Sequence, residues 1–197
     1  KPRARPAAGP GALGSCGAKL VKIIILGAGQ VGRTAAYHLA REEANDVTVV
    51  DTDDRLLREL QDRLDIRTVA GNGAHPSVLE LAGAANADMI VALTNSDEVN
   101  MVACQVAWTL FKTRTKIARI RSLAYSGHEG LFFDTDRPPP DGAGFPVDVY
   151  ISPEELVTQY VERLIRYSGA LQVLEFADGR VRLVGVRAVK GGPLVGQ

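Results

Sequence analysis

A glycine-rich segment with the spacing G-x-G-x-x-G is the part of this sequence best suited to bind a phosphate group. It runs from Gly27 to Gly32, follows the β-branched run Lys22–Leu26 and precedes a helical pattern over Arg33–Glu42. In such a strand–turn–helix unit the first glycine permits a tight turn, the second lets a pyrophosphate approach the backbone, and the third allows close packing of helix and strand. The N–H groups at the helix N-terminus are then available to the phosphates.

An acidic residue at the end of the next predicted strand completes this motif. Asp51 ends the β-branched run Val47–Val50 and lies 19 residues after Gly32, close to the ~20 residues expected of a dinucleotide-binding unit. Its carboxylate would accept hydrogen bonds from a ribose diol and would repel a 2′-phosphate. The motif therefore predicts a site for NAD rather than NADP, and a glycine turn that binds no ligand is the alternative.

Short polar residues follow two further predicted strands. Asn72–Gly73 comes after Arg67–Ala70, and Thr94–Asn95 comes after Met89–Leu93. Ligands of open α/β sheets bind outside the carboxyl ends of the strands, so these residues could contact the base, ribose or phosphates of a nucleotide. The competing interpretation is that they only form turns and cap helices, as Thr and Asn often do.

Two arginines alternate along the next predicted strand, Lys116–Arg121, and therefore share one face of it. Either Arg119 or Arg121 could reach bound phosphates as a bidentate donor. Because an arginine on a sheet face is unusual unless it is paired, an ion pair with Asp97 or Glu98 is the rival explanation.

The histidines and cysteines form no set suited to catalysis. His38 is expected on the solvent side of the first helix, His75 in a loop and His128 in an irregular segment. None stands beside a predictable nucleophile or acid, and no Cys/His spacing matches a metal site. Cys16 and Cys104 are too few for a disulfide framework and indicate free thiols in a reducing compartment. We therefore expect a binding protein without catalytic or metal-ligating residues.

The elements that would position these residues alternate between strand and helix. The expected strands are 22–26, 47–50, 67–70, 89–93, 116–121 and 147–151, with helices between most of them. This order predicts an α/β fold, a Rossmann-like doubly wound parallel sheet with helices on both faces. In the helix after Asn95, the side chains expected to face inward are Val99, Val102, Ala103, Val106 and Leu110. The segment Gly127–Pro146 interrupts the pattern and is expected to be a surface loop whose aromatic side chains pack on the sheet edge.

A helix and a hairpin are expected after the sheet. Ser152 is predicted to cap a helix that begins with Pro153 and ends near Tyr167. Its apolar stripe comprises Leu156, Tyr160, Val161, Leu164 and Ile165. Asp178–Gly179 is typical of a hairpin turn, and a lone hairpin is marginally stable in water. We therefore expect the hairpin to begin a small α+β lobe that continues further or is completed by a partner.

Composition excludes several classes of protein. The chain has 197 residues, is 46% hydrophobic and carries 23 basic and 23 acidic side chains, so wholesale disorder is not expected. Its apolar runs are far shorter than the ~20 residues of a membrane helix. Residues 1–19 hold four basic residues and no acidic one, and we expect a disordered tail or cloning remnant there. The remainder is mildly acidic, which argues against nucleic-acid binding, and the lack of a secretion signal favours the cytoplasm.

Several blocks of the sequence also resemble the TrkA family, the cytosolic nucleotide-binding subunits of bacterial Trk potassium-uptake systems, which are related to RCK (KTN) domains. The blocks are KIIILGAGQVGRTAAYHLA, VVDTDDRLLRELQD, GNGAHPSVLELAGAANADMIVALTNSDEVNMVACQVA, ARIRS, ISPEELV and YSGALQVLEFADG. Together they span about residues 20–196, so the resemblance extends well beyond the glycine motif.

The resemblance implies a domain organisation and a site. It implies a Rossmann-like nucleotide-binding lobe at 20–151, a crossover helix at 152–168 and the start of an RCK C-type lobe at 169–197, which would be incomplete here. The nucleotide-binding residues that it implies are Gly27, Ala28, Gly29, Gln30, Val31, Asp51, Asn72, Gly73, Thr94, Asn95 and Arg119. The implied ligand is NAD or NADH, with ATP or ADP as alternatives at the same site.

The resemblance also implies a function in ligand gating. Such a protein would be no enzyme but a regulatory subunit that gates a membrane potassium transporter from the inner face of the membrane. It would assemble as a homodimer or higher homo-oligomer, with the crossover helix and the strand Val147–Ile151 as expected contacts.

Two other functions are compatible with the same glycine motif, because a fold does not determine a function. An NAD-dependent oxidoreductase would need a substrate domain and an acid or base beside the nicotinamide, and neither is visible after Ile151. A purely structural scaffold would need no ligand.

Overall fold

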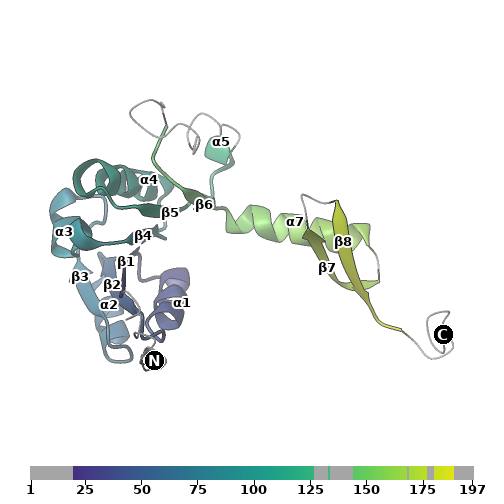
Figure 1. Ribbon diagram of the computed structural model, residues 1–197, viewed down its shortest axis with the longest axis horizontal. Helices are drawn as coiled ribbons and strands as arrows, with labels where there is room; N and C mark the ends of the chain where they lie inside the picture. Colours follow the sequence, from purple (N-terminus) through teal and green to yellow (C-terminus); the bar gives the residue numbers. More distant parts are fainter. Residues whose placement is uncertain (1–19, 127–132, 134–143, 168, 177–179, 189–197) are drawn as a thin grey trace, which may run out of the picture.

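The computed structural model describes residues 20–126, 133, 144–167, 169–176 and 180–188 (Figure 1). Within these ranges, six strands form a parallel sheet and two form an antiparallel hairpin. The sheet consists of β1 (Val21–Leu26), β2 (Asn45–Asp51), β3 (Arg67–Ala70), β4 (Met89–Ala92), β5 (Thr115–Arg119) and β6 (Val149–Ile151). Its order, β3-β2-β1-β4-β5-β6, reverses between β1 and β4, which is the switch point of a doubly wound fold. The predicted Rossmann-like sheet is therefore confirmed.

Helices cover both faces of the sheet (Figure 1). The helices of the described residues are α1 (Gln30–Leu39), α2 (Asp54–Gln61), α3 (Pro76–Leu81), α4 (Asp97–Val106), the short α5 (Leu123–Ser126) and α7 (Pro153–Arg166), together with the 3₁₀-helix η1 (Ala84–Asn86) and the π-helix η2 (Ala107–Phe111). Helices α1 and α2 pack on one face, and α3 and α4 pack on the other.

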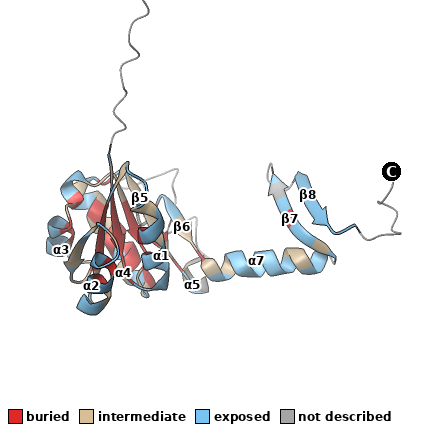
Figure 2. Ribbon diagram, turned by 90° about the horizontal axis from the view of Figure 1, so that it is seen from below, coloured by how far each residue is buried: buried red, intermediate tan, exposed pale blue. Residues whose placement is uncertain are grey.

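The central strand β1 is apolar and buried from Ile23 to Leu26. Ile23 and Ile25 pack with the residues of α1 and α2, whereas Ile24 and Leu26 pack with those of α3 and α4. Successive side chains of a strand point to opposite faces, so a strand covered on both faces buries every one of them. Figure 2 shows this buried layer running through the centre of the lobe.

Helix α4 differs from the prediction in the face that it presents to the sheet. Val102 and Leu110 were expected to face inward but are 41% and 58% exposed. The buried face instead carries Asp97, Asn100, Met101, Ala103 and Cys104. Two causes are visible. The small side chains of Ala103 and Cys104 and the hydrogen-bonded amide of Asn100 fit against the sheet, and Leu110 lies in the π-helix η2, whose period differs from that of an α-helix.

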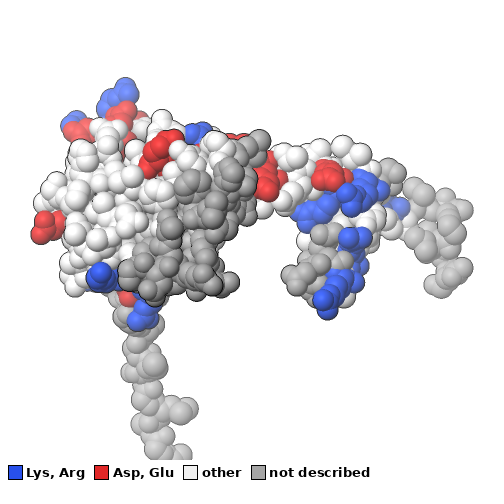
Figure 3. All heavy atoms as spheres, turned by 90° about the horizontal axis from the view of Figure 1, so that it is seen from above, with Lys and Arg blue, Asp and Glu red and all other residues white. Residues whose placement is uncertain are grey.

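Helix α7 extends away from the sheet and carries the hairpin of β7 (Ala170–Phe176) and β8 (Val181–Val186) (Figures 1 and 2). It begins as predicted, since the Ser152 hydroxyl accepts the N–H of Glu155 at 3.4 Å. No described residue of α7 is buried. Basic side chains, including those of Arg163, Arg166 and Arg182, gather on its far half and on the hairpin (Figure 3). The turn at Asp178–Gly179 lies outside the described residues, but the pairing of β7 with β8 confirms the hairpin.

One expectation concerns the segment before the edge strand β6. Most of the interval 127–146 lies outside the described residues, but Phe133 is buried and stacks on Tyr150 of β6, with ring centroids 5.3 Å apart. An aromatic residue of this interval thus packs on the sheet edge, as expected.

Among the residues that the structure describes, no helix combines the length and apolarity needed to cross a membrane.

Candidate functional site

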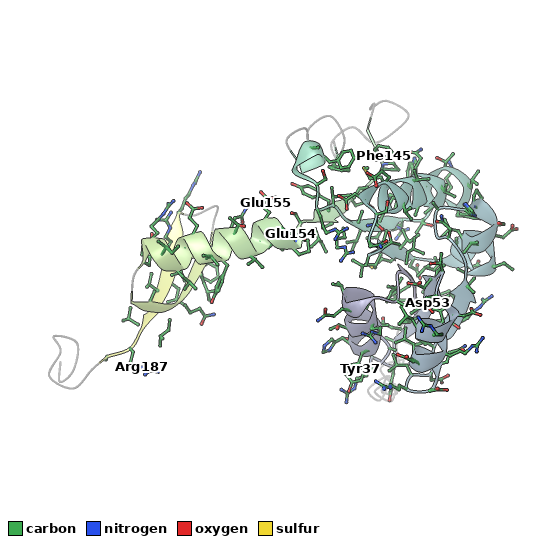
Figure 4. The ribbon with its side chains drawn as sticks, turned by 180° about the vertical axis from the view of Figure 1, so that it is seen from behind. Tyr37, Asp53, Phe145, Glu154, Glu155 and Arg187 are labelled. Atoms are coloured by element: carbon green, nitrogen blue, oxygen red, sulfur yellow. The ribbon has the colours of Figure 1, made fainter. Side chains whose placement is uncertain are left out.

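A cleft of about 520 Å³ opens at the carboxyl ends of the strands, across the switch point between β1 and β4. Ten of the eleven predicted nucleotide-binding residues line it, and the exception is Ala28, whose side chain is fully buried. Six other lining residues were not predicted: Val50, Thr52, Leu56, Gly71, Leu93 and Val99. Four of these are sequence neighbours of predicted site residues. Leu56 and Val99 each lie three residues after a helix N-cap, Asp53 (Figure 4) and Ser96 respectively, which is the signal that could have located them.

The glycine loop between β1 and α1 forms the floor of the cleft. Gly27 has φ +101°, and a Cβ there would lie 2.9 Å from the carbonyl oxygen of Leu93, so only glycine fits without strain. A Cβ at Gly32 would lie 1.8 Å from the carbonyl oxygen of Gly27. Gly29, in contrast, has nothing within 4 Å of such a Cβ. Two glycines are therefore required by the protein itself, and the third borders open space.

The N-terminus of α1 opens into the same cleft without a competing partner. Its N-cap, Gly29, has no side chain to bind the first N–H groups, and the first turn carries no acidic residue. The first N–H groups of a helix have no partner within the helix. They and the positive end of the helix dipole are therefore suited to an anionic group.

Asp51 has a local task that the motif did not predict. Its Oδ2 accepts the backbone N–H of Ala28 at 2.5 Å, and its Oδ1 accepts the N–H of Asp53 at 2.8 Å. The carboxylate thus ties the end of β2 to the glycine loop and to the start of α2. A carboxylate offers about four lone pairs, so Asp51, which lines the cleft, retains acceptor capacity for a ligand hydroxyl.

The loop after β3 supplies a wall of backbone. The Oδ1 atom of Asn72 accepts the N–H of Ala74 at 2.9 Å, which is the turn-forming role that was the alternative for this residue. A Cβ on Gly73 would lie 2.9 Å from a methyl carbon of Leu26, and one on Gly71 would lie 2.7 Å from a methyl carbon of Val78. Close packing therefore explains both glycines, and it brings this loop to the rim of the cleft.

The opposite side of the cleft is formed by the loop after β4. Thr94 is half-buried, and its hydroxyl donates to the Oδ1 atom of Asn100 at 2.7 Å. Asn95 is exposed, and its carbonyl oxygen accepts a hydrogen bond from Arg121. Asn100 was not among the predicted residues. The signal that could have found it is a polar amide four residues after the N-cap Ser96, followed by the apolar residues Met101, Ala103 and Cys104.

The structure separates the two arginines whose roles were left open. Arg121 lies beyond the end of β5, which was expected to reach it but ends at Arg119. The cause is Asp97, whose Oδ2 accepts the N–H groups of Arg121 and Ser122 at 2.9 and 2.8 Å and draws the chain out of the strand. The Nε of Arg121 also lies 3.9 Å from Oδ1 of Asp97. The ion-pair interpretation therefore holds for Arg121.

Arg119 lines the cleft and is half-buried. Its Nη2 donates to the carbonyl oxygen of Thr94 at 2.5 Å, but its buried Nε has no hydrogen-bond partner within the described ranges. Burial lowers the pKa of its guanidinium, and the charge of Arg121 lowers it further. Glu154, on the part of α7 nearest the sheet (Figure 4), opposes that shift. A desolvated cation with an unused donor favours an anionic ligand.

Nothing in the described part of the chain suggests metal chemistry. No group of three or more His, Cys, Asp or Glu side chains is placed to hold a metal ion among those residues. The side chains that meet in the cleft are a carboxylate, amides, hydroxyls and a guanidinium. They can accept from hydroxyls and donate to phosphates, which is the chemistry of binding.

Comparisons with known proteins identify a family that this chain matches in sequence. The family model described as the TrkA-N domain matches residues 23–128. The Trk system potassium uptake protein TrkA of Halomonas elongata is 62% identical over 177 residues, which cover 90% of this chain and 37% of that protein. The chain spans about 37% of the length of several such curated relatives.

Two solved structures resemble the chain in fold. The TrkA-N domain of the inner membrane protein ybaL from Escherichia coli has a TM-score of 0.59 at 18% identity, covering 73% of this chain and 96% of that one. The GsuK channel bound to NAD has a TM-score of 0.54 at 22% identity, covering 80% of this chain and 26% of that one.

Proposed function

This chain belongs to the TrkA-N domain family, and from that membership and the geometry of its cleft we propose that it is a nucleotide-binding regulatory module of a membrane potassium-uptake system. The observation that carries the proposal is that Arg119, with its unpartnered Nε, and the uncapped N-terminus of α1 line one cleft at the switch point. The proposed ligand is NAD or NADH, with ATP or ADP as competitors for the same cleft. The GsuK channel, a neighbour in fold, is described as bound to NAD, which supports that choice.

We propose a place in the cleft for each part of such a ligand. The adenosine ribose would lie at Asp51, where the negative charge would repel a 2′-phosphate. The pyrophosphate would lie over Gly29, where the cleft has open space beside the backbone. The second half of the ligand would extend past β4 toward Thr94, Asn95 and Arg119.

Regulation requires that the bound site be connected to an element that moves, and the sheet offers a short connection. Arg119 pairs in register with Ile151 of β6, and the N–H of Ile120 donates to the carbonyl oxygen of Ile151 at 3.0 Å. Ser152, the N-cap of α7, follows directly. We propose that α7 changes its position with the ligand. A ligand can shift such an equilibrium only by its differential affinity for the two arrangements.

The proposed module has a lobe at 20–151, a crossover helix at 152–168 and the start of a second lobe at 169–197. Its proposed partners are a second copy of the chain and the transporter, through which it would lie on the inner face of the membrane. The support for self-association is the apolar face of α7, where Leu156, Val157, Tyr160, Val161 and Ile165 are exposed, Val157 at 62% and Ile165 at 74%. An apolar patch of this kind is typical of an interaction surface.

Calorimetric titration of the purified chain with NADH, NADPH, ATP and ADP tests the proposal. We expect NADH to bind more tightly than NADPH, because of Asp51, and ATP or ADP to compete with NADH. Absence of binding by all four nucleotides at millimolar concentration would refute the proposed function. Steady consumption of NADH with small carbonyl compounds would instead favour an oxidoreductase.

A further inference from the structure

Asn100 is a fully buried amide that joins the ends of two strands beneath the cleft. Its Oδ1 accepts the N–H of Thr94 at 3.0 Å and the hydroxyl of Thr94 at 2.7 Å. Its Nδ2 donates to the carbonyl oxygen of Arg119 at 2.8 Å and to that of Thr94 at 3.3 Å. Thr94 follows β4, and Arg119 ends β5.

These four contacts use the whole hydrogen-bonding capacity of the side chain. A carboxamide has two N–H donors and two acceptor lone pairs on its oxygen, and each has a partner here. An ionised aspartate of the same shape offers acceptors only, so it would face the carbonyl oxygens of Thr94 and Arg119 without a proton between them. An apolar residue would remove all four of these hydrogen bonds.

Arg119 depends on the same arrangement. Its Nη2 donates to the carbonyl oxygen of Thr94, which Asn100 also binds. The amide therefore sets the position of the Arg119 backbone and of the oxygen to which the guanidinium is anchored. Both Thr94 and Arg119 line the cleft, whereas Asn100 itself does not.

The other half of the cleft is held by separate contacts. Asp51 binds the N–H groups of Ala28 and Asp53, and Asn72 binds the N–H of Ala74. None of these bonds involves Asn100. Loss of the amide should therefore disturb the side of the cleft formed by β4 and β5 and leave the side formed by β1, β2 and β3 in place.

We propose that Asn100 is a positioning residue for the second half of the site, and that it determines the preference for ligands that span the whole cleft over mononucleotides. The inference rests on the proposed function. A dinucleotide such as NADH extends past the phosphate loop to Thr94 and Arg119, and it needs both halves. AMP, seated by its ribose at Asp51 and its phosphate at the N-terminus of α1, needs only the first half.

The test compares the affinities of NADH and AMP by calorimetry in the parent chain and in Asn100→Asp and Asn100→Ala. We expect NADH affinity to fall by about tenfold or more, as loss of buried hydrogen bonds implies, and AMP affinity to change much less. The matched control is Cys104→Ala, which removes an equally buried side chain one turn later in α4. That variant should lower the thermal midpoint without changing the ratio of the two affinities.

A second measurement does not depend on the variants folding. In the parent chain, the side-chain NH₂ resonance of Asn100 should shift on addition of NADH and stay in place on addition of AMP. An unchanged NADH-to-AMP ratio in a folded Asn100 variant, or an equal response of this resonance to both nucleotides, would overturn the inference. If the parent chain binds neither nucleotide, the proposed function fails and the inference fails with it, whereas binding with an unchanged ratio removes the inference alone.

Discussion

The carboxylate of Asp51, at the end of β2, accepts the backbone N–H of Ala28 in the glycine loop at 2.5 Å. Its other oxygen accepts the N–H of Asp53, the N-cap of α2. One side chain thus connects the loop after β1, the end of β2 and the start of α2. The residue that the motif assigns to a ribose is therefore also part of the framework that shapes the cleft.

Asp51→Asn is expected to lower both stability and ligand affinity. An amide has a single acceptor oxygen, so the N–H of Ala28 or that of Asp53 loses its partner, at about 1–3 kcal/mol. With the charge gone, the preference for NADH over NADPH should also narrow. Urea unfolding and calorimetry measure the two effects. An unchanged unfolding free energy would show that the contacts to Ala28 and Asp53 contribute nothing to stability.

Gly32→Ala and Gly29→Ala are expected to have different effects, although the two residues are three positions apart. The Cβ of the first would lie 1.8 Å from the carbonyl oxygen of Gly27, so β1 and α1 must separate and the chain should be strongly destabilised. The second has open space and a backbone that any residue adopts, so it should fold normally but bind nucleotide more weakly. Thermal unfolding and NADH titration of both variants check this. A stable Gly32→Ala chain would contradict the packing argument.

Lys116 and Asp148 form an ion pair whose two partners are unequally buried. This asymmetry predicts which substitution lowers the free energy of unfolding more. The Lys116 side chain is 2% exposed, that of Asp148 is 45% exposed, and Nζ lies 2.8 Å from Oδ2. Asp148→Asn removes the negative charge beside a buried cation whose other partners are two carbonyl oxygens and the Trp108 ring, and it alters the group that also accepts the backbone N–H of Lys116 at 2.6 Å. It should cost up to about 3–5 kcal/mol.

The counterpart Lys116→Met leaves only a carboxylate that water reaches, so it should destabilise the chain less than Asp148→Asn. Urea unfolding of both single variants and of the double variant measures the order. If Lys116→Met proves the more damaging change, the contacts of the ammonium with Asp148, the two carbonyl oxygens and the Trp108 ring outweigh the cost of burying its charge.

The Cys104 thiol is expected to be unreactive in the folded chain. Burial raises its pKa to about 12, and Asp148 adds to the shift while Lys116 opposes it. In a Cys16→Ser background, where Cys104 is the remaining cysteine, a thiol reagent at about pH 8 should react only as fast as the chain unfolds. Rapid reaction under native conditions would mean that α4 opens locally.

The same raised pKa has a consequence for stability. At pH values between the ordinary thiol pKa and about 12, the folded chain retains a proton that the unfolded chain has released. The unfolding free energy should therefore fall as pH rises through this window, and the contribution is fully present below it. Cys104→Ser, compared with its parent over that range, should show a flatter dependence.

Val157→Glu is expected to weaken self-association without unfolding the lobe. Val157 is 62% exposed at the centre of the apolar face of α7, so the charge should change chain stability by less than about 0.5 kcal/mol. If that face binds a second copy, light scattering should show a larger monomer fraction. Gln159→Glu introduces the same charge on the polar face of the helix and should leave the mass unchanged. Equal behaviour of the two variants would place the contact elsewhere.

Local patterns explain why most of the fold was predictable. Buried parallel strands need continuous apolar runs such as Ile23–Leu26, and the caps at Asp53 and Ser152 are decided within four residues of the chain. The glycine motif is local in the same way, since the clash between Gly32 and Gly27 involves a single turn. Ten of the predicted site residues line one cleft because the carboxyl ends of parallel strands meet at one edge.

The remaining features depend on groups that are distant in the sequence. Which arginine enters the cleft was decided by Asp97, whose carboxylate captures the N–H of Arg121 across 24 residues and ends β5 at Arg119. The inward face of α4 was decided by packing on the sheet and by the hydrogen bonds of Asn100 and Asp97. Periodicity alone carries no information on either contact.

By itself, then, the sequence determined most strands and helices, the parallel direction of the strands and the residues at the strand ends. These features follow from spacing and from the geometry of neighbouring residues. The tertiary structure alone decided how those residues are held. It placed Asn100 beneath Thr94 and Arg119, and it buried Lys116 beside Asp148. A polar group can leave water at low cost only when a partner lies beside it, and the folded chain is what brings the two to the same place.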